Sequence, residues 1–130
     1  RSVKPLREAL MLPKFKLKLV FGKANRPSKT YGGLVKKYPD KLGGGGKASA
    51  KYYPKSINVS QKEALSIALI KNVKKLSDKI NNFSEQELDF FILPHPLLGK
   101  VTLREMMYFT IYHVEHHIEL TKRNLKNIQN

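Results

Sequence analysis

Apolar residues recur at helical spacing through the second half of the chain. They follow one another at intervals of three or four: Leu65, Leu69, Val73, Leu76, Ile80 and Phe83. This spacing places them on one face of a helix, as is typical of a helical bundle. Ser60 followed by Glu63 is a capping-box signature, in which a hydroxyl and a carboxylate satisfy free backbone N–H groups. The pattern therefore predicts a helix from about Ser60 to Asn81.

The same S/T-x-x-E signature recurs at Ser84 and at Thr102. The first predicts a short helix over residues 84–91, which the following Pro-His-Pro sequence ends because proline cannot continue a helix. The second predicts a long helix over residues 102–127. Together with the helix before them, these elements favour an all-α fold.

The first half is less regular. Val3, Leu6 and Leu10 have helical spacing and predict the last turns of a helix. Residues 15–19 alternate between apolar and basic side chains, which is a strand signal. The same alternation also fits a short buried helix, and the chain offers no obvious partner strand. We favour a helical or irregular segment there.

Residues 22–59 form a long irregular connection rich in Lys, Gly, Pro and Ser. Apolar residues between Leu34 and Leu42 predict one short amphipathic helix inside it. The glycine run at 43–46 then ends regular structure. It lacks the preceding strand and the following G-K-[ST] sequence of a phosphate-binding loop, so we interpret it as a flexible hinge.

Composition narrows the class of protein. A chain of 130 residues fits a single domain over residues 1–130, and 41% hydrophobic residues favour a packed core. The absence of Cys excludes disulfides and thiolate metal sites. No apolar run is long enough for a membrane span and no signal peptide opens the chain, so we expect a cytoplasmic protein with no membrane partner.

Charge is unevenly distributed along the chain. Residues 1–55 hold 15 Lys and Arg against 2 acids, a net charge of +13, whereas residues 56–130 hold 10 against 8, a net charge of +2. A basic half can bind nucleic acid or an acidic partner. A solvated lysine-rich surface is the simpler interpretation, and nucleic acid is not favoured because no stacking or recognition motif accompanies the charge.

Three of the four histidines, His113, His116 and His117, lie within five residues. Because a helix advances about 100° per residue, His113 and His117 fall on one face, about 40° apart and on the packed side, with His116 at its margin. Two imidazoles at i and i+4 can bind one metal ion. A buried histidine can also be simply hydrogen-bonded in a core, and the residue types alone leave both interpretations open.

A tight metal site needs a third ligand. His95 precedes the last helix, and His113 lies eleven residues into that helix, roughly 16 Å along its axis, so only a chain reversal brings His95 back. The apolar stripe of residues 65–83 contributes no carboxylate. We therefore expect the third ligand to be absent from this chain or to lie upstream of Arg1.

The H-x-x-H-H sequence formed by His113, His116 and His117 resembles the last helix of DinB-like proteins, and residues 93–117 are similar to members of that superfamily over their whole length. The resemblance implies an up-down four-helix bundle with a long connection, here incomplete at its N-terminus. It also implies a divalent metal such as Zn²⁺ or Ni²⁺ held by three histidines. Two of these correspond to His113 and His117, and the third belongs to a second helix, upstream of Arg1.

The same resemblance implies a metal-dependent thiol transferase or hydrolase that acts on a small molecule, with homodimers as the expected assembly. His116 is then a surface residue or an acid/base group beside the metal. The alternative hypothesis is a non-enzymatic basic helical module that binds an acidic partner or nucleic acid. The two hypotheses differ in one measurable property, the presence of a stoichiometric divalent metal.

Overall fold

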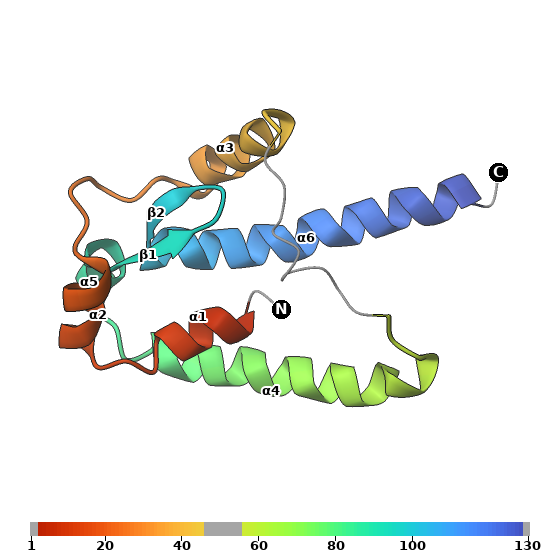
Figure 1. Ribbon diagram of the computed structural model, residues 1–130, viewed down its shortest axis with the longest axis horizontal. Helices are drawn as coiled ribbons and strands as arrows, with labels where there is room; N and C mark the ends of the chain where they lie inside the picture. The colour runs from red at the N-terminus through yellow and green to blue at the C-terminus, as the bar shows by residue number, and fades with distance from the viewer. Residues whose placement is uncertain (1–2, 46–55, 129–130) are drawn as a thin grey trace.

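The computed structural model describes residues 3–45 and 56–128. Its elements run in the order α1 (Val3–Ala9), α2 (Lys14–Phe21), α3 (Tyr31–Gly43), the 3₁₀ turn η2 (Val59–Gln61), α4 (Lys62–Ile80), α5 (Glu85–Phe90), β1 (Ile92–His95), β2 (Gly99–Thr102) and α6 (Leu103–Ile128) (Figure 1). The described part is mostly helical, which confirms the predicted class in general, and it adds one two-stranded sheet. None of the described helices is long and apolar enough to cross a membrane.

Two of the three predicted capping boxes are present and start the helices expected of them. At α5, the backbone N–H of Glu87 donates to Ser84 Oγ (3.2 Å), and the N–H of Ser84 donates to Glu87 Oε2 (2.9 Å). At α6, Thr102 and Glu105 make the same reciprocal pair, at 3.2 and 3.0 Å. Each pair satisfies two donors that a helix start leaves free.

The capping box predicted at Ser60 is wrong. Asn58 and Gln61 make that exchange instead and start the turn η2 two residues earlier. The first residue of α4 is Lys62, and its N-cap residue Gln61 makes no side-chain cap. An Asn is at least as good a cap as Ser, so the earlier pair takes the role.

The first half contains more helix than its sequence pattern indicates. Residues 15–19 lie in α2, which confirms the helical interpretation of their alternation. The short helix expected in the 22–59 connection is α3, where Thr30 Oγ1 accepts from the N–H of Gly33. The rest of the predicted hinge after Gly45 lies outside the described residues.

A small hairpin was not predicted. β1 and β2 pair in antiparallel register from Ile92–Thr102 to His95–Gly99, in the segment expected only to end a helix. Gly99 has a positive φ of 74°, which favours glycine. Pro94 cannot donate to a ladder, and a two-stranded sheet tolerates it because both strands are edges. The sheet departs from the purely helical prediction.

The hydrophobic core gathers around the start of α6. Leu17 of α2, Leu34 of α3 and Leu103 of α6 are all at most 1% exposed, and residues of α5 and the hairpin complete the cluster. In space, α5 and both strands pack on α6, whereas α1 packs on α4 (Figure 1). The core therefore fixes the first turns of α6, the helix that carries three histidines.

The predicted apolar stripe of α4 is buried only in part. Leu76 is 7% exposed, but Leu65 and Leu69 are 45% and 57% exposed. The seven-residue helix α1 lies beside the C-terminal part of α4 and leaves its N-terminal turns uncovered (Figure 1). The stripe therefore predicts the helix correctly, but only the last turns of the helix form a packed face.

Candidate functional site

α6 brings His113 and His117 face to face. Their Nε2 atoms lie 3.0 Å apart and their ring centroids 4.4 Å apart, as the i, i+4 spacing allows. His113 is half-buried, but His117 is exposed. The expectation that both rings face the packed side is therefore right for His113 and wrong for His117, because the cover that α3 provides reaches His113 and His116 only.

That cover is Tyr38, a buried residue of α3. Its ring contacts five others, with centroid distances of 5.1 to 6.4 Å: His95, Phe109, Tyr112, His113 and His116. Its hydroxyl approaches Nδ1 of His113 to 3.5 Å. Burial raises the pKa of Tyr38, so the phenol keeps its proton. Tyr38 therefore occupies the Nδ1 side of His113 and leaves Nε2 facing His117.

His95 returns to this cluster, through the chain reversal that the sequence analysis did not expect. The hairpin supplies the chain reversal and places the His95 ring 4.2 Å from that of Phe109, one turn before His113 on α6. Nδ1 of His95 accepts from the backbone N–H groups of Leu97 (3.2 Å) and Leu98 (3.1 Å). His95 thus closes the hairpin turn, with its ring proton on Nε2.

His95, His113 and His116 are neutral at physiological pH. Burial and the charge of His117 lower the pKa of His113 to about 4, and burial together with His113 lowers that of His95 to about 4. The pKa of His116 is also lowered, by partial burial and by the neighbouring His117 charge. A neutral imidazole keeps a free nitrogen lone pair, which is the form that binds metal.

The distance between the two Nε2 atoms suits a shared metal ion. Two metal–nitrogen bonds of about 2.1 Å that end on atoms 3.0 Å apart enclose an angle of about 90°, the angle between adjacent ligands of an octahedral ion. A tetrahedral Zn²⁺ ion, with an angle of about 109°, needs the two nitrogens about 3.4 Å apart. In the metal-free chain, one ring would instead donate its N–H to the other. Within residues 3–45 and 56–128, no group of three or more His, Asp or Glu is placed to hold a metal.

A second polar centre, missed by the sequence analysis, ties the connection to α6. Glu105 is fully buried, and its carboxylate receives both arms of Arg26 (2.6 and 2.8 Å) together with the N–H groups of Lys29 (2.7 Å) and Thr102 (3.0 Å). Burial alone would raise the pKa of Glu105, but these donors outweigh it and lower the pKa to about 2. Only the capping role of Glu105 had a sequence signal.

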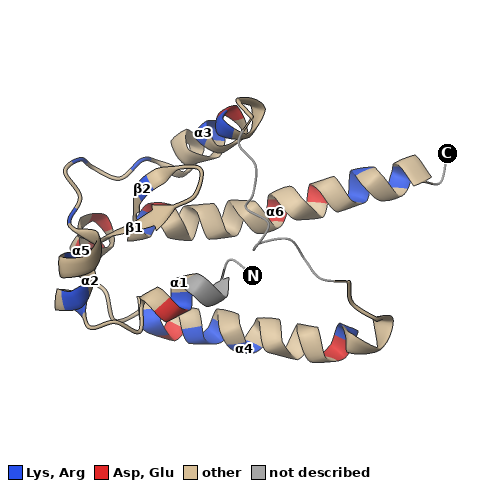
Figure 2. Cartoon of the chain, in the orientation of Figure 1, with Lys and Arg blue, Asp and Glu red and all other residues tan. Residues whose placement is uncertain are grey.

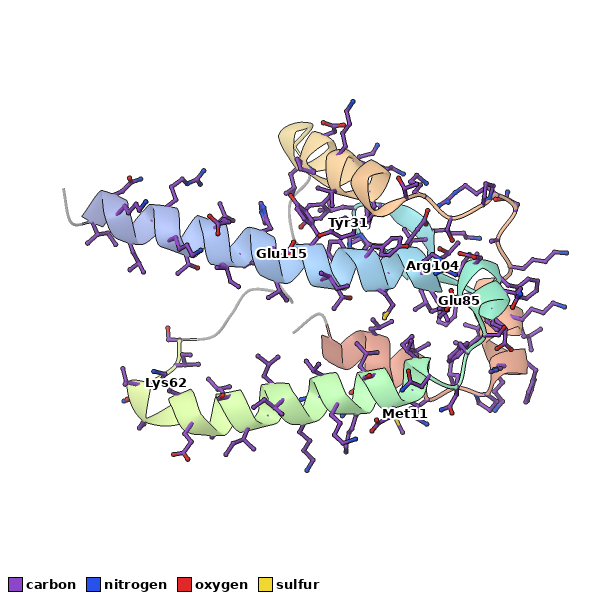
Figure 3. The ribbon with its side chains drawn as sticks, turned by 180° about the vertical axis from the view of Figure 1, so that it is seen from behind. Met11, Tyr31, Lys62, Glu85, Arg104 and Glu115 are labelled. Carbon is purple, nitrogen blue, oxygen red and sulfur yellow. The ribbon has the colours of Figure 1, made fainter. Side chains whose placement is uncertain are left out.

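Further polar contacts reinforce the hydrogen-bond network around Glu105. Arg104 bonds Asp89 (2.7 Å) and Glu85 (2.7 Å) of α5, and Arg104 and Glu85 lie together at the start of α6 (Figure 3). Further along, the Tyr31 hydroxyl donates to Glu115 (3.0 Å), which holds the first turn of α3 beside α6 (Figure 3). The position of Tyr38 over the histidines is therefore fixed from several sides.

Several cations lie next to Glu105 and its hydrogen-bond donors. Lysines follow the connection and α3 (Figure 2), and Lys37, half-buried, makes no hydrogen bond or ion pair with the described residues. Burial first, and then the charges of Lys29, Arg26 and Lys41, lower the pKa of Lys37. The sequence indicates a basic half, but not that the charges of Lys29, Arg26 and Lys41 act on Lys37.

No protein-family model, no curated protein and no solved structure matches this chain. The assignment of a function therefore depends on the residues themselves.

Proposed function

We propose that this protein binds a divalent metal ion such as Zn²⁺ or Ni²⁺ through Nε2 of His113 and Nε2 of His117. The observation that carries the proposal is the distance of 3.0 Å between these two atoms on neighbouring turns of α6. The low pKa of His113 keeps that ligand neutral at pH 7. Tyr38 supports it further, because a phenol oxygen near Nδ1 can accept the ring proton and leave Nε2 free for the metal.

The remaining ligands come from outside the described residues. Two histidines hold a metal weakly, and three neutral imidazoles make a site that keeps open positions. We propose that the third is a histidine from a segment upstream of Arg1, as in the DinB-like bundles that the sequence resembles. The exposure of His117 fits this arrangement, since a further ligand needs access to the side of the pair that α3 leaves open.

The activity proposed for this site is the transfer of a thiol or the hydrolysis of a small molecule in the cytoplasm. A divalent ion lowers the pKa of a bound water or thiol and so supplies a nucleophile near pH 7. His116 lies beside the pair, with its ring centroid 5.7 Å from that of His117, and is placed to exchange a proton there. Tyr38 and Phe109 exclude water from the other side of His113.

We further propose a homodimer. Ile111, Val114 and Ile118 form an apolar stripe on α6 and are 48–55% exposed, away from the histidine face. Exposed stripes of this kind mark association surfaces. Sedimentation or light scattering over a range of concentrations measures the assembly state directly.

The test is metal content. Protein without a His tag, from a chain that includes any segment upstream of Arg1, is dialysed against Zn²⁺ or Ni²⁺, and the bound metal is measured by elemental analysis. We expect about one ion per chain, and a loss of about tenfold or more in affinity for His113→Ala and for His117→Ala. His116→Ala is the matched control, with the same residue type on the same turn, and should keep its metal.

Unchanged metal content in both His113→Ala and His117→Ala would overturn the proposal. The same holds if the metal-free protein binds no divalent ion, since the pair would then be an N–H···N hydrogen bond between two rings. Co²⁺ absorption provides a second readout, because ligand-field bands change when an imidazole leaves the metal.

A further inference from the structure

A cleft lies where the connection before α3 meets α5 and the start of α6. Its volume is about 330 Å³, at the lower end of the range of small-molecule sites, so it can hold one ring-sized molecule. The side chains with polar groups that line it are Ser28, Lys29, Thr30, Asp89, Arg104 and Tyr108. Because this lining is polar, we expect a polar ligand.

Hydrogen bonds hold the wall formed by Asp89 and Arg104 in one arrangement. Arg104, which lies at the start of α6 (Figure 3), places Nε 2.7 Å from Oδ1 and Nη2 3.1 Å from Oδ2 of Asp89, so the two planar groups lie side by side. Ser28 Oγ donates to Oδ1 of Asp89 and lies 2.7 Å from the hydroxyl of Thr102. A wall that is already fixed loses little entropy when a ligand binds.

The same wall keeps unused hydrogen-bonding capacity. Nε and Nη2 make all the hydrogen bonds of Arg104 to the described residues, so the two N–H groups of Nη1 are free to donate. Oδ2 of Asp89 receives one hydrogen bond and can accept another. Two neighbouring hydroxyl groups match this wall, because one can accept from Arg104 while the other donates to Asp89.

The ion-paired charges around the cleft cancel. Arg104 pairs with two carboxylates of α5, at 2.7 Å each. Lys29 lies 3.5 Å from Glu105, which a second cation, Arg26, also pairs. Among these groups, three cations stand against three carboxylates. This balance favours a neutral ligand over an anion or a cation.

An aromatic ring supplies the apolar side of the cleft. Tyr108 follows Arg104 by one turn of α6, so the two side chains share a face of that helix. Tyr31 packs edge-on against the Tyr108 ring, at a centroid distance of 5.7 Å, and holds it beside the cleft. Such a ring can cover the C–H groups of a sugar and still offer its hydroxyl for a polar contact.

We infer that this cleft binds a neutral sugar ring through two neighbouring hydroxyl groups. Nη1 of Arg104 donates to one hydroxyl oxygen, Oδ2 of Asp89 accepts from the next hydroxyl, and the Tyr108 ring lies against the C–H face of the sugar. The inference does not depend on the metal proposed at His113 and His117, because the two sites share no residue.

The test is a titration of the chelator-treated protein, followed by its amide resonances, with methyl β-D-ribofuranoside and with its 2-deoxy analogue. The two sugars share a ring, but only the first has adjacent hydroxyl groups. We expect saturable shifts at residues 28–30, at Asp89 and at Arg104, with a dissociation constant of about 1–10 mM for the ribofuranoside. The deoxy sugar should bind about tenfold more weakly, because it leaves one group of the wall without its partner.

Two variants separate a contact with the sugar from a change of charge. Asp89→Asn should weaken binding of the ribofuranoside about tenfold, since it removes the charged acceptor. Glu85→Gln is the matched control: it removes a carboxylate of the same helix that bonds the same Arg104 but does not line the cleft, and should leave the affinity unchanged. Circular dichroism shows whether each variant folds, and the comparison of the two sugars needs no variant.

An absence of saturable shifts with the ribofuranoside overturns the inference, and so does equal affinity for the two sugars. Equal weakening by Asp89→Asn and Glu85→Gln has the same consequence, because the loss of charge around Arg104 then explains the effect. If inorganic phosphate binds at these residues more tightly than the ribofuranoside, the cleft is an anion site and the inference is wrong.

Discussion

The face where α3 meets α6 and the arm formed by α1 and α4 differ in how their helices are held. On the α3–α6 face, a buried carboxylate, a fork of arginine bonds and a cluster of aromatic rings join segments about 80 residues apart in sequence. On the arm, a hydrogen bond from Arg7 to Asn72 (2.9 Å) crosses between α1 and α4, and half of the apolar stripe of α4 is exposed.

This difference separates what a helix needs in order to form from what it needs in order to be held in place. Both α4 and α6 have helical periodicity, and both form. Only α6 carries Glu105, whose buried charge demands partners and receives them from the connection and from its own helix start. The candidate site is on the helix that is held in place.

Glu105→Gln should cause the largest loss of stability, because it breaks the contacts that hold α6 in place. It removes the charge that Arg26 pairs with while the residue stays fully buried, so we expect a loss of about 3 kcal/mol in the free energy of unfolding. Urea unfolding followed by circular dichroism measures it. Glu119→Gln, an exposed position on the same helix, is the control and should cost under about 1 kcal/mol.

The pH dependence of the free energy of unfolding separates the effect of the Glu105 charge from the effect of its side-chain shape. Its folded pKa of about 2 lies below its ordinary value of 4.5, so its contribution is complete above pH 4.5 and is lost as pH falls toward 2. The lost stability is about 3 kcal/mol, at 1.36 kcal/mol per unit of pKa. Glu105→Gln should flatten this part of the profile. An equally steep decline in the variant would assign the acid sensitivity to other groups.

Sequence patterns predicted the elements that local contacts decide. The helix starts at Ser84 and Thr102 depend on side chains three residues apart, and both are where the signatures place them. The start predicted at Ser60 is wrong because Asn58 and Gln61 form a competing local pair two residues earlier. In each case the deciding interaction lies within one turn of the helix.

The candidate site was predictable to the same extent. The i, i+4 spacing alone places His113 and His117 face to face, and the structure agrees. The approach of His95, the cover by Tyr38 and the exposure of His117 depend on how distant segments pack, and no periodicity encodes that. The hairpin that returns His95 was hidden by prolines, which usually argue against a strand.

Leu76→Ala and Leu69→Ala compare the two halves of the α4 stripe. Leu76 is 7% exposed in the core, so its truncation should cost about 2–3 kcal/mol in the free energy of unfolding. Leu69, 57% exposed, should cost about 0.5 kcal/mol at low protein concentration. Chemical unfolding of both variants is the measurement. Equal losses would show that the N-terminal half of the stripe is covered in solution, and a concentration-dependent loss at Leu69 alone would favour the homodimer.

The smallest expected effects concern the helix starts. Ser84→Ala removes the acceptor for the N–H of Glu87 at the start of α5, on the side of the molecule that holds α6, and should cost about 1 kcal/mol. Ser60→Ala removes a hydroxyl that caps no helix, because Asn58 accepts the backbone N–H there, and should change the stability by no more than about 0.3 kcal/mol. Thermal and urea unfolding of the two variants, measured together, show whether Ser84 caps its helix and Ser60 does not. A loss at Ser60 as large as that at Ser84 would mean that the α4 start uses the capping box that its sequence suggests, and that the arm is held more firmly than its contacts indicate.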